Sequence, residues 1–130
     1  MNQQQFVKTT TILPVDNIEK CCKWYKQTLG LKTTYLHEGE NENEATNYAI
    51  LERDGVEIHL ILDELPQYGE VWTKAGTGYL YLKVSNIEGM YQEVKFSGAT
   101  VARELQKENW GAIGFNLIDP SGNAVHVEQG

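Results

Sequence analysis

The 130-residue sequence has little cysteine, little positive charge and no long apolar run. Its two cysteines, Cys21 and Cys22, are adjacent. Neighbours on a helix point in different directions, which disfavours a disulfide between them and predicts two reduced thiols, with a vicinal redox pair as the alternative. A membrane span needs about 18 consecutive apolar residues, and the chain has no such stretch. The opening MNQQQFVKTTT lacks the basic and apolar segments of a signal peptide, so a cytoplasmic protein is expected.

Basic residues are outnumbered by acidic ones. Eleven Lys and Arg stand against 18 Asp and Glu, which gives a formal net charge of −7. This balance argues against a nucleic-acid partner, because a phosphate backbone is bound by clustered positive charge. It is compatible with a cationic ligand, which an acidic cleft would attract. The alternative is that the charge serves solubility alone.

Two stretches of the sequence occur twice in the same order. VDNIE at 15–19 recurs as VSNIE at 84–88, 69 positions later. DGVEIHL at 54–60 recurs as SGNAVHV at 121–127, 67 positions later. Landmarks that keep their order and nearly their spacing indicate a duplicated unit, and the period is too long for a solenoid. The sequence therefore predicts a single domain, 1–130, built from a pseudo-symmetric pair.

Each copy, 7–63 and 77–129, has the pattern of one helix and four strands. Asp16-x-x-Glu19 and Ser85-x-x-Glu88 are capping boxes that predict the two helix starts. Alternating apolar residues before and after each helix predict strands. The strands are expected at 8–15, 31–37, 46–52 and 56–62 in the first copy and at 78–84, 99–104, 112–118 and 123–128 in the second.

Two longer motifs resemble those of a known family. WYKQTLGL at 24–31 and NWGAIGFNLIDPSGNAVHV at 109–127 look like signatures of the vicinal oxygen chelate superfamily, which includes glyoxalases, extradiol dioxygenases and bleomycin resistance proteins. The Trp110-Gly111 pair and its spacing to Asp119-Pro120 are most similar to the bleomycin resistance proteins. The resemblance implies an α+β fold in which two βαβββ units form curved mixed sheets around a cup, with the helices on the outer face. It also implies a homodimer with clefts at its interface.

Strand alternation, read within such a fold, sorts side chains between the helices and the cup. Residues expected to face the helices are Ile58, Leu60, Val125 and Val127. Residues expected to face the cup are Glu57, His59, Ile61, Tyr79, Tyr81, His126 and Glu128. The two histidines thus occupy equivalent positions of the two copies, either as ligand contacts or as hydrogen-bonded sheet residues.

The resemblance also locates the four metal-ligand positions of the metal-dependent members. They fall at Thr10, His59, Tyr79 and His126, and only the two histidines are good ligands for a divalent ion. No cofactor is therefore expected. The alternative is a metal-dependent enzyme of the glyoxalase or dioxygenase kind that uses His59 and His126, with Glu57 or Glu128 completing the set.

Aromatic side chains favour binding over chemistry. Flat rings stack on planar heterocycles and attract cations to their faces, and bleomycin-type antibiotics are both planar and positively charged. The function expected from the resemblance is capture of a cationic planar antibiotic without turnover. A scaffold whose acidic loop, 38–44, recruits another protein is a further alternative. The residues expected to contact the ligand are Tyr35, Tyr48, His59, Trp72, Tyr79, Tyr81, Trp110, Asn116 and His126.

Overall fold

The chain folds as two successive units with the same order of elements. The computed structural model describes residues 3–39, 46–63 and 74–130. Within this part, no helix is long and apolar enough to cross a membrane. The first unit contains β1 (Thr11–Val15), α1 (Ile18–Leu29), β2 (Lys32–His37), β3 (Tyr48–Arg53) and β4 (Val56–Leu62). The second contains β5 (Tyr79–Val84), α2 (Ile87–Phe96), β6 (Val101–Lys107), β7 (Ile113–Ile118) and β8 (Ala124–Gln129).

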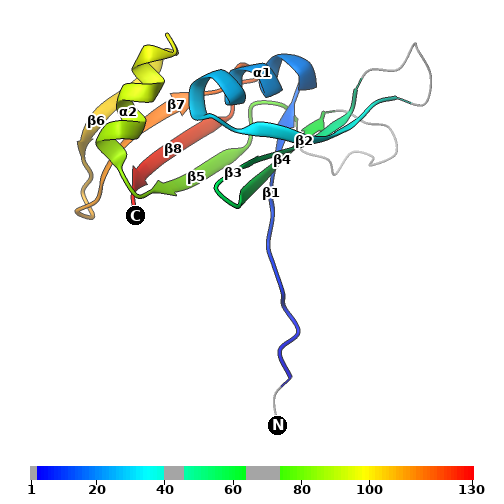
Figure 1. Cartoon of the computed structure of the whole chain (residues 1–130), viewed down its shortest axis with the longest axis horizontal. Coiled ribbons are helices and arrows are strands. Elements are labelled where there is room, and N and C mark those ends of the chain that lie inside the picture. Colours follow the sequence, from blue (N-terminus) through cyan, green and yellow to red (C-terminus); the bar gives the residue numbers. More distant parts are fainter. Residues whose placement is uncertain (1–2, 40–45, 64–73) are drawn as a thin grey trace.

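Each unit forms one four-stranded mixed sheet, as predicted. The strand orders are β1-β4-β3-β2 and β5-β8-β7-β6, so the two sheets have the same topology. The first and last strands of each unit pair in parallel, while the other pairs are antiparallel. Both helices lie on the same side of the sheets (Figure 1), which leaves the opposite sheet faces uncovered by any described helix. The segment before β1 runs away from the body of the molecule.

Both helices begin one residue later than the capping boxes predict. Asn17 Oδ1 accepts a hydrogen bond from the backbone N–H of Lys20, and Asn86 Oδ1 accepts one from Gly89. Asparagine is as good an N-cap as aspartate or serine, so either register satisfies the free N–H groups of the first turn. The carboxylate of Asp16 is used elsewhere, because it accepts a hydrogen bond from the Ser121 hydroxyl.

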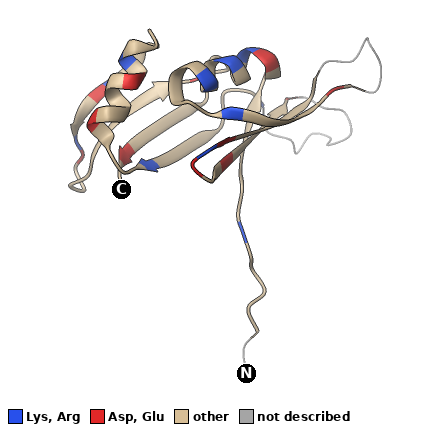
Figure 2. Ribbon diagram, in the orientation of Figure 1, with Lys and Arg blue, Asp and Glu red and all other residues tan. Residues whose placement is uncertain are grey.

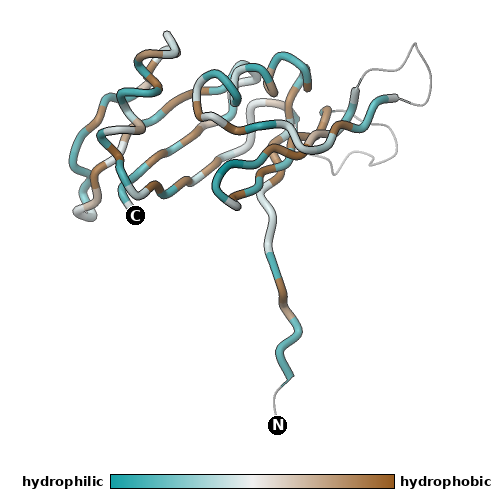
Figure 3. Tube along the Cα trace, in the orientation of Figure 1, coloured by the Kyte–Doolittle hydropathy of each residue, from teal (hydrophilic) through white to brown (hydrophobic). Residues whose placement is uncertain are grey.

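The helix-facing sides of the two sheets share one hydrophobic core. Hydropathy alternates along the strands (Figure 3), as expected for sheets with one packed face. The four residues predicted to face the helices are all buried in this core. Trp24 on α1 packs against it with its ring edge on Tyr25, which gives it a structural role. The predicted helix-facing residues in the core are Ile58, Leu60, Val125 and Val127.

The turn between β7 and β8 fastens the second unit to the first. The hydroxyl of Tyr25 on α1 donates to Asp119 Oδ2 at 2.8 Å. The Asn123 amide donates to the carbonyl of Pro14 in β1 at 2.8 Å and to Asp119 at 3.0 Å, and its oxygen accepts from the Gly78 N–H. Asp119 and Asn123 are buried and fully partnered, so these residues of the DPSGN motif hold the fold together.

Candidate functional site

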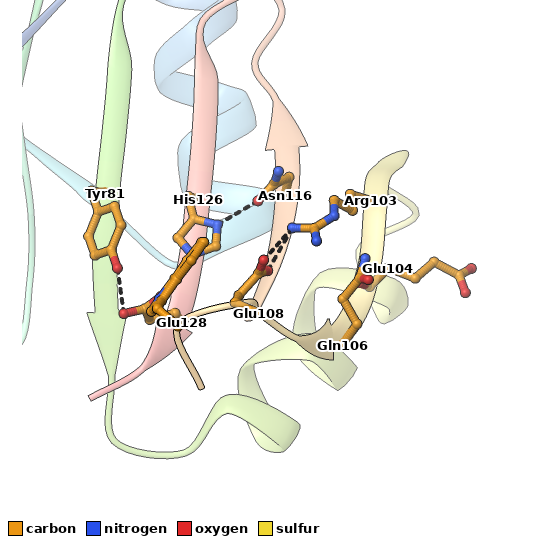
Figure 4. A network of polar contacts seen from close by, with 9 residues as sticks. Tyr81, Arg103, Glu104, Gln106, Glu108, Asn116, His126 and Glu128 are labelled. Atoms are coloured by element: carbon orange, nitrogen blue, oxygen red, sulfur yellow. Dashed lines mark hydrogen bonds and ion pairs between the residues drawn. The ribbon is translucent and has the colours of Figure 1, made fainter. Parts of the chain in front are cut away.

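Four side chains lie in one row across the uncovered face of the second sheet. The strand register pairs Tyr81 with His126, His126 with Asn116, and Asn116 with Arg103. Each of the four strands contributes one member, and Figure 4 shows them side by side. Cross-strand neighbours of this kind are about 5 Å apart at Cβ, close enough for direct contact. We call these four residues the polar row.

A buried carboxylate joins one end of the polar row to Trp110. Glu128 Oε2 accepts a hydrogen bond from the Tyr81 hydroxyl at 2.5 Å. Glu128 Oε1 accepts from Trp110 Nε1 at 3.1 Å and lies 3.0 Å from His126 Nε2. The hydrogen bonds from Tyr81 and His126 hold the pKa of Glu128 below its usual range, and the same carboxylate raises the pKa of Tyr81. Glu128 is therefore ionised and already satisfied by protein donors.

His126 is a buried residue that holds the side chains around it in position. It is only 2% exposed, and both of its ring nitrogens have partners: Nδ1 lies 2.6 Å from Asn116 Oδ1, and Nε2 faces Glu128. The rings of Tyr81 and Trp110 lie over it, with centroids 5.0 and 6.0 Å away. A side chain fixed at both nitrogens orients its neighbours rather than reaching a ligand itself.

Trp110 presents a fixed aromatic surface. Its indole N–H is held by Glu128, yet the residue is 61% exposed. It lies in the turn between β6 and β7, which is closed by hydrogen bonds between Glu108 and Ala112 and between Gly111 and Glu108. Gly111 adopts φ +97°, a conformation that other residues rarely adopt. The turn therefore requires the glycine that follows Trp110.

The same turn fixes the other end of the polar row. Arg103 Nη1 donates to both carboxylate oxygens of Glu108 at 2.7 Å. The Glu108 side chain is 1% exposed, whereas that of Arg103 is 42% exposed. A buried carboxylate thus anchors a partly exposed guanidinium. Neither residue was identified from the sequence.

The first sheet has a corresponding row with different chemistry. Its register pairs Ile12 with His59, His59 with Ile50, and Ile50 with Tyr35. A register shift between Thr33 and Tyr35 in β2 matches the one between Val101 and Arg103 in β6. A β-bulge re-aims the residue that follows it, so both bulges turn the fourth member of the row onto the uncovered face. We call Ile12, His59, Ile50 and Tyr35 the apolar row.

His59 in the apolar row has its own two partners. Its Nδ1 lies 2.5 Å from the Tyr48 hydroxyl, and its Nε2 lies 2.7 Å from Glu57 Oε1. The hydrogen bond from His59 lowers the pKa of Glu57. The side chains of His59 and Glu57 are 16% and 33% exposed, so this group is more open to solvent than the one around His126.

Comparison with known proteins identifies the family. The family model described as the Glyoxalase/Bleomycin resistance protein/Dioxygenase superfamily matches residues 6–127. The chain belongs to this superfamily. No curated protein sequence matches the chain.

Several solved structures share the fold. TioX from Micromonospora sp. ML1 matches with a TM-score of 0.71 at 15% identity, over 94% of this chain and 98% of that one. A bleomycin-binding protein complexed with bleomycin also matches with a TM-score of 0.71, at 16% identity, over 96% of this chain and 99% of that one. A bleomycin resistance determinant encoded on the transposon Tn5 matches equally well, at 16% identity over 95% and 98% of the chains. At these identities the likeness establishes the fold.

Two of the four metal-ligand positions that the resemblance implies carry histidine, which commonly binds divalent ions. His59 and His126 have both ring nitrogens occupied by protein partners. At the other two positions, threonine and neutral tyrosine are poor ligands for zinc, nickel or iron. Among the residues that the structure describes, no three His, Cys, Asp or Glu side chains are grouped to hold an ion.

The structure divides the predicted ligand contacts between two sheets. It brings Tyr81, Trp110, Asn116 and His126 together, with exposed Tyr79 on the same strand as Tyr81. It places Tyr35, Tyr48 and His59 on the first sheet. Predictions that involve Trp72 and most of the acidic loop 38–44 lie outside the described residues.

The side chains of Tyr81 and Trp110 are exposed on this sheet face in a single chain. Two grooves in the described ranges, of about 580 and 370 Å³, are lined by Arg53 together with residues of α2, and neither is lined by Trp110. Acidic and basic residues are interspersed over both units (Figure 2), so the net charge is not gathered at the polar row. Two acids of that face, Glu108 and Glu128, are already bound to protein donors.

Proposed function

We propose that this protein is a cytoplasmic homodimer that captures a planar, cationic aromatic molecule without transforming it. The observation that carries the proposal is the Trp110 indole. Its N–H is tied to buried Glu128, while its ring remains largely exposed. An aromatic wall that is rigid before binding costs little ordering entropy when a flat ligand stacks on it.

Two features of the protein would attract the positive charge of such a ligand: its net negative charge and its exposed aromatic rings. The carboxylates nearest Trp110 are satisfied, so they offer no free acceptor to a cation. The exposed rings of Tyr79 and Tyr81 are available for cation–π contacts. The net charge of −7 attracts a cation over a longer range.

A second copy of the chain would turn the open faces into clefts. The uncovered faces expose several large apolar side chains, an arrangement typical of interaction surfaces. The segment before β1 also exposes Phe6 and Val7, which are 93% and 91% accessible. A two-fold dimer would create two equivalent clefts. The exposed residues on or beside the two rows are Ile12, Tyr35, Tyr79, Tyr81 and Trp110.

Calorimetric titration with metal-free bleomycin, followed by its copper complex, tests the proposal. We expect one ligand per chain and a loss of affinity of at least about fivefold in Trp110→Ala, since stacking on an aromatic side chain contributes on the order of 1–3 kcal/mol. Trp24→Phe, on α1, is the matched control and should leave binding unchanged. Light scattering on the same samples measures whether the chain is a dimer.

Two outcomes would contradict the proposal. Absence of heat with either form of bleomycin would remove an antibiotic of this class as the ligand. Binding that Trp110→Ala leaves unchanged would place the ligand elsewhere on the molecule.

A further inference from the structure

The polar row ends in hydrogen-bond donors that the protein does not use. Each ring nitrogen of His126 faces an oxygen, Asn116 Oδ1 or Glu128 Oε1, so this arrangement requires a proton on both nitrogens. With both nitrogens donating, Asn116 Nδ2 has no partner in the described ranges. Arg103 Nη1 is bound to Glu108, while its Nη2 and Nε have no protein acceptor there either. Figure 4 shows the Arg103 guanidinium between Asn116 and Glu108. Two adjacent side chains thus carry unused N–H groups on the same open face.

These donors are held in place rather than free to move. The guanidinium is anchored at 2.7 Å on both oxygens of a carboxylate that is almost completely buried. The Asn116 amide is oriented by the 2.6 Å contact with His126, which is itself fixed by Glu128. Fixed donors lose little entropy on binding, so each contributes more to recognition than a mobile surface side chain.

The same turn positions these donors relative to Trp110. Glu108, which anchors Arg103, and Trp110 both belong to the turn closed by the Glu108–Ala112 hydrogen bond. Trp110 also donates a hydrogen bond to Glu128. Glu128 in turn contacts His126, and His126 contacts Asn116. The aromatic surface and the donors are therefore parts of one rigid arrangement.

We propose that Arg103 and Asn116 form an acceptor subsite beside Trp110. In this subsite the two protein side chains donate hydrogen bonds, and the ligand supplies the acceptor. The acceptor is a carbonyl or carboxylate oxygen conjugated to the aromatic ring that stacks on the Trp110 indole. The fork of a guanidinium and the N–H of an amide match the in-plane lone pairs of such an oxygen. The inference rests on the proposed function for its stacking surface, and it specifies the polar group that the ligand carries there. A positive charge on the ligand lies away from this edge of the ring.

Three naphthalene derivatives test the subsite by calorimetry at physiological salt. 2-Naphthoate carries a charged acceptor, 2-naphthamide a neutral acceptor, and 2-naphthylmethylammonium a cation with no acceptor. We expect the two acceptor probes to bind at least about tenfold tighter than the ammonium probe, because a hydrogen bond to a charged donor contributes on the order of 1.5–3 kcal/mol. Naphthoate against naphthamide shows whether the subsite requires a full negative charge.

Two variants remove the donors without leaving a buried charge alone. The pair Arg103→Gln with Glu108→Gln deletes the guanidinium and the carboxylate that anchors it. Asn116→Leu removes the Nδ2 donor with a side chain of similar size and adds no charge to the site. Each should abolish most of the preference for acceptor probes. The control Lys107→Gln removes one positive charge from the same strand and should keep the preference. Circular dichroism establishes that each variant is folded.

The outcomes separate this inference from the proposed function. Equal affinity for the three probes, lost in Trp110→Ala, would overturn the subsite and leave aromatic capture standing. Tightest binding of the ammonium probe would also overturn it. Failure of every naphthalene probe to bind the wild-type protein would overturn the subsite, whereas the bleomycin titration decides the proposed function independently. If the preference for acceptor probes survives in both donor variants, residues other than Arg103 and Asn116 cause it and the proposed subsite is wrong.

Discussion

The two sheets place a histidine at the same point of the same register, but its cross-strand neighbours and its burial differ. In the second sheet His126 lies between Tyr81 and Asn116 and is buried in a closed network around Glu128. In the first sheet His59 lies between Ile12 and Ile50 and remains partly exposed. Duplication of the unit thus preserved the position of the side chain, while the surrounding row determines its role. One histidine stabilises an aromatic surface, and the other links a tyrosine to a carboxylate near solvent.

The largest expected effect comes from the turns that join the last two strands of each unit. The second-unit turn contains Asn123, which is buried and bonds to Pro14, Asp119 and Gly78. We expect Asn123→Ala to lower the free energy of unfolding by about 3 kcal/mol, since it leaves several buried groups without partners. Urea denaturation measures this value. Asp54→Asn, in the exposed first-unit turn, should change it by less than about 0.5 kcal/mol.

Replacing the two histidines tests the comparison directly. His126→Leu removes the donor to Glu128 and the partner of Asn116 within a buried network, and should cost about 2 kcal/mol. His59→Leu affects groups that water can reach and should cost less than about 1 kcal/mol. Thermal unfolding of both variants gives the difference. Equal destabilisation would show that the two networks are equally closed.

Gly114 occupies the register position that Tyr48 occupies in the first sheet. A Cβ at Gly114 would lie 2.6 Å from the carbonyl oxygen of Val127 and 3.1 Å from His126 Cε1. Gly114→Ala should therefore cost about 1–2 kcal/mol by overpacking and disturb the support of Trp110. Unfolding curves report the first effect and ligand titration the second. Unchanged stability would contradict this prediction and would mean that neighbouring atoms can shift to accommodate the Cβ.

The smallest expected effect is on pH dependence. The folded-state pKa of Glu128 is below its usual range, so its contribution is present above the ordinary carboxyl pKa and is lost as pH falls through the folded value. Glu128→Gln should flatten the decrease of stability in acid. Glu57→Gln should flatten it less, because Glu57 is more exposed and such pairs are screened by water. Urea midpoints measured across acidic pH test both; a steeper acid loss in Glu128→Gln would contradict the assignment.

The fold could be predicted because its signals are local and occur twice. Strand alternation, helix starts and turns recur at nearly constant spacing, and each strand was placed to within about three residues, the usual error at element ends. The helix starts were shifted by one residue because adjacent polar residues, Asp16 and Asn17, are both good caps. Only the distant Ser121, which bonds to Asp16, shows which of them is free to cap.

The site could be predicted only in part. His126 was identified because its strand alternates without interruption. Trp110 was identified because its motif resembles a family signature. Arg103 was missed because β6 contains register shifts on both sides of it, and alternation counted through a bulge assigns the wrong face. Glu108 was missed because a charged turn residue is normally exposed, and its burial depends on the conformation of the turn.

The buried turn at 119–123 also bears on when the protein folds during its synthesis. The first unit ends at residue 62, but the hydroxyl of Tyr25 and the carbonyl of Pro14 find their partners in Asp119 and Asn123. A ribosome that has made only the first unit therefore exposes to water the apolar and polar groups that the second unit buries, which leaves the first unit poorly stable by itself. Native structure is therefore expected to form late, after almost the whole chain has emerged from the ribosome.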